Sequence, residues 1–195
     1  MIPFNKIHSG LDVAYANIEL EENEHLFGQR GLRKNMSGVH SAMSDIWVRY
    51  KDITECEKTG DYSTMNDEHD SVWLHHLQFI KQLCFSVMTM VDGERLGGVL
   101  ITKLPAGGRI LPHVDKGWHA GYYSKCYIPI KNKEGAIFKF GDNIIEPDEG
   151  DVWMFDNSVE HEVINDSSED RIAMVVCVKQ SRYQRNGKSI YLGGF

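Results

Sequence analysis

The segment 151–165, DVWMFDNSVEHEVIN, holds two short apolar runs on either side of a polar turn. Val, Trp and Phe in the first run, and Val and Ile in the second, are typical of β-strands. The Asp, Asn and Ser residues between the runs favour a turn. The segment therefore predicts a strand, a turn and a second strand, with His161 at the start of the second strand.

The same pattern extends outward from this segment, from about residue 96 to about residue 180. Short runs rich in β-forming residues alternate with Gly, Pro, Asn and Asp turns. The runs are GGVLITKLP (97–105), RILPHV (109–114), YYSKCYIPI (122–130), AIFKF (136–140), NIIE (143–146), DVWMF (151–155), EHEVIN (160–165) and RIAMVVCVKQ (171–180). No helical segment intervenes, as βαβ units would require. The region predicts a mainly β fold, a double-stranded β-helix (a cupin-like jelly roll).

The first part of the chain has a different periodicity and predicts flanking helices. Segment 11–27 has apolar residues at helical spacing. Segment 70–88 does so more strongly, with Asp70 or Ser71 as the N-cap. Its apolar stripe consists of Trp73, Leu77, Ile80, Cys84 and Val87. Segment 39–52 alternates like a strand, and the polar segment 53–70 predicts a loop.

The length of 195 residues predicts a single domain, residues 1–195. Within it we expect a mixed, partly helical support region at 1–95, the jelly-roll core at 96–180 and a tail at 181–195. Nothing in the sequence indicates the oligomeric state.

Charge and cysteine content disfavour several classes of partner. The formal net charge is −7, and no dense basic run is present, so a nucleic-acid substrate is not expected. The short stretch RGLRKN (30–35) predicts a solvated loop. The four cysteines are widely spaced, and we find neither a signal-peptide pattern nor an apolar run of roughly 20 residues. We therefore expect a cytoplasmic protein without a membrane partner.

A second histidine and an aspartate lie one residue apart in RILPHVDKGW (109–118), at the end of a predicted strand. His113 and Asp115 alone are weak evidence of a metal site, because H-x-D arises often by chance. His161 lies 46 residues after Asp115, far enough for intervening strands to bring it beside them. Two histidines and one carboxylate form a facial triad, which suits non-haem Fe(II) that binds dioxygen and a chelating cosubstrate.

Arg171 opens the last long strand, ten residues after His161. A buried arginine is costly unless it meets an anion, and its guanidinium group matches a carboxylate in a bidentate geometry. The alternative is an exposed arginine at a strand edge. His40, Ser44, Asp45 and Arg49, on the predicted strand 39–52, are candidate substrate contacts.

These motifs together resemble a known family. The segments are LPAGGRILPHVD (104–115), YIPI (127–130), GDVWMFDNSVEHEVIN (150–165) and RIAMVV (171–176). Over about residues 96–180 the chain resembles the Fe(II)- and 2-oxoglutarate-dependent dioxygenases, and most closely the aspartyl/asparaginyl β-hydroxylase family. Vertebrate members have glycine at the position of Asp115, whereas this chain keeps the carboxylate.

The resemblance implies an enzyme that hydroxylates an amino acid, free or within a peptide or protein, of the Asp or Asn type. It implies that His113, Asp115 and His161 form the catalytic Fe(II) site, with O2 and 2-oxoglutarate as cosubstrates. It further implies that Arg171 pairs with the distal carboxylate of 2-oxoglutarate. A cupin-like metal-dependent isomerase or binding module is the alternative, and it gives Arg171 no fixed role.

Three further residues are expected near the cosubstrate. Tyr123, Lys125 and Tyr127 share one face of a predicted strand, because strand side chains alternate. If this face points inward, they reach 2-oxoglutarate or the substrate. The family often has Arg or His on this strand, so Lys125 and Tyr127 depart from its pattern.

Overall fold

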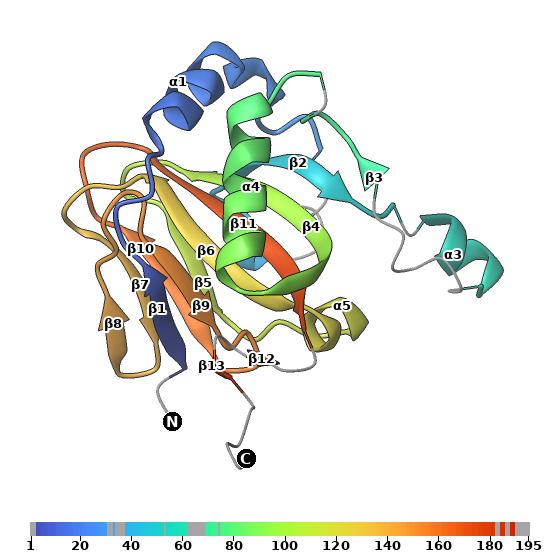
Figure 1. Cartoon of the computed structure of the whole chain (residues 1–195). Helices are drawn as coiled ribbons and strands as arrows, with labels where there is room; N and C mark the ends of the chain where they lie inside the picture. Colours follow the sequence, from blue (N-terminus) through green and yellow to red (C-terminus); the bar gives the residue numbers. More distant parts are fainter. Residues whose placement is uncertain are drawn as a thin grey trace.

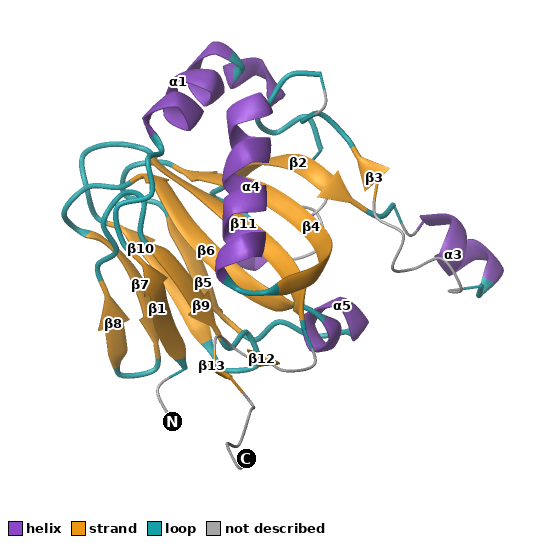
Figure 2. Cartoon of the chain, viewed as in Figure 1, coloured by secondary structure: helices purple, strands orange, loops and turns teal. Residues whose placement is uncertain are grey.

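The structure is a computed structural model that describes residues 3–30, 33, 38–52, 54–61, 69–73, 75–181, 184–185 and 188–189. Antiparallel sheets dominate it, with the helices at the periphery (Figures 1 and 2). The predicted jelly roll with flanking helices is confirmed. Across these residues, no helix is both long and apolar enough to span a membrane.

Two main sheets form the core of the described chain. The larger sheet has the order β1 (Phe4–His8), β9 (Val152–Phe155), β6 (Ser124–Lys131), β11 (Arg171–Gln180), β4 (Gly93–Leu104), β2 (Ser44–Tyr50) and β3 (His69–Asp70). The smaller sheet has the order β5 (Arg109–His113), β10 (His161–Asn165), β7 (Ala136–Phe140) and β8 (Asn143–Ile145). A short ribbon pairs β12 (Gln184–Arg185) with β13 (Lys188–Ser189).

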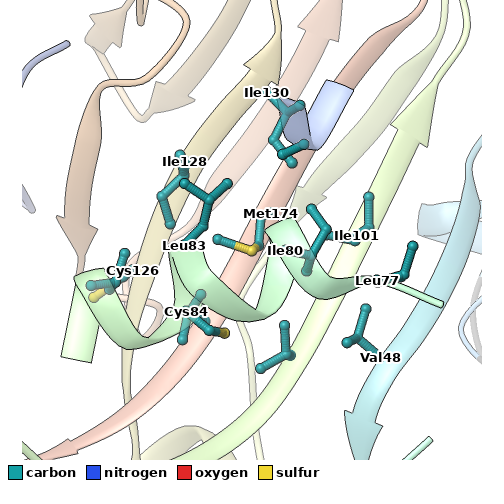
Figure 3. Packing of buried hydrophobic residues seen from close by; sticks show 14 of the residues in the cluster. Val48, Leu77, Ile80, Leu83, Cys84, Ile101, Cys126, Ile128, Ile130 and Met174 are labelled. Carbon is teal, nitrogen blue, oxygen red and sulfur yellow. The ribbon is translucent and has the colours of Figure 1, made fainter. Parts of the chain in front are cut away.

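The helices are α1 (Ala14–Glu22), α3 (Thr54–Thr59), α4 (Gln78–Met90) and α5 (Trp118–Tyr122), with the 3-10 turns η1 (Glu24–Leu26) and η2 (Gly38–His40). Figure 3 shows α4 lying across the larger sheet, with Ile80 next to Met174 and Leu83 next to Ile128. These four side chains are buried. Burying a side chain of this size contributes about 1.5–3 kcal/mol, so this contact is a main source of stability.

Alternation along β11 separates the two faces of the larger sheet. Ile172, Met174, Val176 and Val178 belong to the core beneath α4. Arg171, Ala173, Val175 and Cys177 point the other way and line a cavity between the sheets. The strand is therefore apolar on one face and carries functional candidates on the other.

The predicted helix 70–88 begins later than the sequence suggests. Asp70 lies in β3, where its Oδ1 accepts a hydrogen bond of 3.0 Å from Nε of Arg49. The backbone N–H of Ser71 donates to the carbonyl of Val48 at 2.8 Å, and the helix starts at Gln78 without a side-chain cap. Tertiary hydrogen bonds thus overcome the local capping signal. Trp73 and Leu77 are nevertheless buried in the same core, so the stripe correctly predicted burial.

The other N-terminal predictions have mixed outcomes. The helical segment 11–27 is confirmed by α1 and η1, and the strand within 39–52 is confirmed by β2. The loop predicted at 53–70 is wrong at 54–59, where α3 forms. Oδ1 of Asp52 accepts a hydrogen bond of 3.0 Å from the backbone N–H of Thr54, which favours the helix start. Residues 62–68 of that segment lie outside the described residues.

Gly150 allows the close approach of two chain segments ahead of β9. Its φ is +79°, its carbonyl accepts from the N–H of Leu11, and an added Cβ would lie 2.1 Å from the carbonyl oxygen of Leu11. We expect Gly150→Ala to lower the free energy of unfolding by roughly 2–4 kcal/mol, because backbone strain and a backbone clash combine. Urea denaturation measures the loss.

Gly141→Ala is the matched control for this variant. Gly141 also has a positive φ, +56°, but an added Cβ would meet nothing within 4 Å. Strain alone should then cost about 1–2 kcal/mol. Equal losses in the two variants would contradict the role given to the Leu11 contact.

Candidate metal centre

Two adjacent strands of the smaller sheet place the histidines together. β5 and β10 pair antiparallel with His113 opposite His161, and the ring centroids are 4.4 Å apart. Asp115 follows β5, and its backbone N–H donates to the carbonyl of Asn157 at 3.1 Å. The turn before His161 thus also fixes Asp115. One ligand atom from each of the three residues lies within 4.8 Å of the others.

Backbone carbonyls orient both imidazole rings. Nδ1 of His113 is 2.8 Å from the carbonyl oxygen of Leu111, and Nδ1 of His161 is 2.9 Å from that of Val159. A carbonyl oxygen only accepts, so each Nδ1 carries the proton and each Nε2 presents a lone pair. Both rings are therefore in the tautomer that a metal ligand at Nε2 requires.

The charge states also fit a divalent cation. Burial lowers the pKa of His161 and so keeps the ring neutral. Burial alone would raise the pKa of Asp115, but the charge and hydrogen bond of Lys125, together with the two histidines, bring the net pKa below its usual value. A metal binds imidazole in its neutral form, so two histidines and one carboxylate would make a donor set of charge −1, which fits Fe(II).

The three residues line a cavity of about 600 Å³ between the two sheets. Its wall near His161 is aromatic, since the rings of Phe155 and Phe138 lie 5.6 and 5.8 Å from the imidazole centroid. Val163 and Ala173 add aliphatic surface. Such a wall limits the access of water to whatever is bound beside the histidines.

Arg171 places a buried cation in the same cavity. The residue is only 2% exposed, and its Nη2 donates to the hydroxyl of Tyr127 at 2.6 Å. Its buried Nε has no hydrogen-bond partner, and Arg171 forms no ion pair with an acidic residue in the described part of the chain. A buried guanidinium without a counter-ion is costly, so this position fits an anionic ligand. Burial also raises the pKa of Tyr127, which keeps its hydroxyl neutral.

Of the three residues predicted to contact the cosubstrate from one strand, two line the cavity and one does not. Lys125 and Tyr127, both on β6, line the cavity, and Nζ of Lys125 contacts Oδ2 of Asp115. Tyr123 precedes β6 and is not among the described residues that line the cavity. Its ring lies 4.7 Å from that of His119 and covers Gly97, where an added Cβ would lie 2.6 Å from it. The cosubstrate contacts of these three residues stay predictions.

The candidate substrate contacts in segment 39–52 have other partners, and His40 lies in η2 rather than on the strand. Arg49 donates to Asp70 and to the carbonyls of Leu96 and Gly97 while lining the cavity. His40 is buried with its ring 4.8 Å from that of His113. Burial, followed by the nearby cations, lowers the pKa of His40 to about 3, so the ring is neutral.

Arg33 corrects the expectation of a solvated loop at 30–35. It lines the cavity and lies 3.6 Å from Oδ1 of Asp45, with its side chain 25% exposed. Residues 31, 32, 34 and 35 lie outside the described residues. No periodic pattern surrounds Arg33 in the sequence, so nothing local signals that the chain returns to the cavity here.

Comparisons with known proteins agree with this geometry. The family described as Aspartyl/Asparaginyl beta-hydroxylase matches residues 61–181 of the chain. No curated protein sequence matches the chain significantly.

Several solved structures are similar in fold. A prolyl hydroxylase from Trichoplax adhaerens, solved in complex with a peptide of the hypoxia inducible factor oxygen degradation domain, aligns with a TM-score of 0.60 and 13% identity over 91% of this chain and 84% of that chain. An oxidoreductase of the 2OG-Fe(II) oxygenase family from Burkholderia pseudomallei aligns with a TM-score of 0.51 and 14% identity, over 93% of this chain and 97% of that chain. A Pseudomonas putida prolyl-4-hydroxylase aligns with a TM-score of 0.50 and 13% identity, over 92% of this chain and 93% of that chain. At these identities the likeness concerns the fold alone.

Proposed function

The chain belongs to the aspartyl/asparaginyl β-hydroxylase family, whose members are 2-oxoglutarate-dependent hydroxylases that use iron, and we propose that it hydroxylates an amino acid of the Asp or Asn type. The substrate is a free amino acid or a residue within a peptide or protein. His113, Asp115 and His161 are the proposed iron ligands. Their donor atoms, charge states and ring orientations support this assignment.

The observation that carries the proposal is the buried Arg171 beside this donor set. A guanidinium group with a free Nε, in the cavity that the ligands line, requires an anion. A dicarboxylate that chelates the iron at one end and reaches Arg171 at the other meets both requirements. A cupin-like isomerase or binding module, the alternative, gives this cation no fixed role.

Fe(II) bound here with 2-oxoglutarate and O2 would supply the oxidising chemistry that converts a C–H bond into C–OH. The chain supplies the rest. Arg171 and Tyr127 would hold the distal carboxylate, His113, Asp115 and His161 would hold the metal, and Phe138 and Phe155 would exclude water. Lys125 and Tyr123 complete the set of residues proposed near the cosubstrate.

The proposed cellular context is the cytoplasm. All four cysteines are free and buried, which fits a reducing compartment. Residues 96–180 are the proposed catalytic core, 1–95 its support and 181–195 a tail, with no nucleic-acid or membrane partner.

Anaerobic titration of the metal-free protein with Fe(II), then with 2-oxoglutarate, tests the proposal. We expect a weak visible charge-transfer band that forms only when both are present, because the keto acid must chelate the metal. Bound Fe(II) without this band would contradict the oxygenase and favour the cupin-like alternative.

A further inference from the structure

The two oxygens of the Asp115 carboxylate face different groups. Oδ1 lies 3.8 Å from Nε2 of His113, on the side where the three candidate ligand atoms gather. Oδ2 contacts Nζ of Lys125. One oxygen is thus directed at the proposed metal position, and the other is held by an ammonium group.

Lys125 occupies a fixed place in the fold. It lies on β6 between two neighbours of the larger sheet, with Phe155 of β9 and Cys177 of β11 as its register partners. Its side chain is 18% exposed, so the ammonium group is held within the cavity rather than moving freely in solvent. A lysine anchored in this way can fix the rotation of the Asp115 carboxylate.

We propose that Lys125 is a positioning residue for the metal centre, which holds Oδ2 of Asp115 and so presents Oδ1 alone to the metal. This inference rests on the proposed function, since it requires Asp115 to be a ligand. A carboxylate that binds through both oxygens takes an additional coordination position. Two imidazoles and one carboxylate oxygen leave the three positions that a chelating keto acid and dioxygen need.

Titration of the protein with Mn(II) alone, monitored through the EPR signal of the free ion, tests this role without turnover. We expect Lys125→Met to weaken Mn(II) binding by about 10- to 100-fold, the usual effect of removing a group that orients a ligand. Loss of a nearby positive charge would by itself strengthen the binding of a cation. The expected weakening therefore separates orientation from simple electrostatics. Lys125→Arg should restore binding.

A coordination signature gives an independent readout. In Lys125→Met the freed Asp115 carboxylate can turn and bind Mn(II) through both oxygens. We expect fewer water molecules on the bound ion than in the unaltered protein, as measured by water proton relaxation. A change confined to folding would not alter this number.

A double-mutant cycle shows whether Lys125 acts through Asp115. In the Asp115→Ala background, Lys125→Met should cause no further weakening, because no carboxylate remains to be oriented. Lys139→Met is the matched control. Nζ of Lys139 pairs at 2.8 Å with Glu162, the residue that follows His161 in the sequence. Lys139→Met therefore removes the same charge but no contact to an oxygen of a proposed ligand.

The outcomes are distinct. Unchanged or tighter Mn(II) binding in Lys125→Met overturns the inference and means that the metal merely displaces the ammonium group. Equal weakening in both backgrounds also overturns it. Absence of Mn(II) binding to the unaltered, folded protein overturns the proposed metal centre itself. Circular dichroism checks folding, and Lys125→Gln replaces Lys125→Met if that variant fails to fold.

Discussion

Replacing His161 by alanine is expected to abolish both metal binding and hydroxylation. His161 supplies one of three candidate donors within 4.8 Å of each other, and Val159 holds its ring in the required tautomer. Loss of a residue that merely orients a ligand costs about 10- to 100-fold in metal affinity, so loss of a ligand should exceed that range. Mn(II) titration measures the affinity, and succinate formation measures the activity.

His25→Ala is the matched control, because it removes an exposed histidine on η1. We expect this variant to bind Mn(II) as the unaltered protein does. If His161→Ala folded normally and kept its Mn(II) affinity, the proposed ligand set would be wrong.

Replacing Arg171 by methionine is expected to have opposite effects on binding and on stability. Affinity for 2-oxoglutarate should fall by roughly 30- to 5,000-fold, because truncating one member of a buried charge pair costs about 2–5 kcal/mol. The ligand-free protein should gain about 1–2 kcal/mol of unfolding free energy, because a buried charge with no ion-pair partner among the described residues is removed. Anaerobic titration of the Fe(II)-loaded protein and urea denaturation measure the two quantities.

Two further variants separate the components of this effect. Tyr127→Phe removes the hydroxyl that accepts a hydrogen bond from Arg171 but keeps the guanidinium group, so the affinity for 2-oxoglutarate should fall less than in Arg171→Met, by about 10- to 150-fold. Arg109→Met removes an exposed arginine that is paired with Asp166 at 3.2 Å and should change neither quantity appreciably. A ligand-free Arg171→Met protein that was less stable would show that the guanidinium group is structural.

The sequence predicted the strands of the core well, because burial on one or both faces leaves a period of two in the residue pattern. It also predicted which residues gather in the cavity: His113, Asp115 and His161 come together, with Arg171 nearby. Their assignment as iron ligands and carboxylate clamp stays a prediction that the variants above test.

Other features depend on tertiary contacts that no local pattern records. The sequence placed the start of this helix at Asp70 or Ser71, whereas the helix begins at Gln78, because Asp70 pairs with Arg49 across two strands instead of capping the helix. The contact of Lys125 with Asp115 joins the larger sheet to the loop after β5, and only the packing of the sheets brings them together. Nδ2 of Asn165 donates to the carbonyls of Leu104, Pro105 and Glu169, and so fixes the strand ends.

The two faces of β11 also determine how this protein can be engineered. Substitutions beneath α4, at positions such as Met174, alter stability without reaching the cavity, whereas Ala173 and Val175 change the cavity wall and leave the helix contact intact. A library aimed at new substrates should therefore vary the cavity face of β11, on a background stabilised first through the opposite face. A one-residue deletion within the strand would exchange the faces and place Arg171 beneath the helix, so such libraries should keep its length constant.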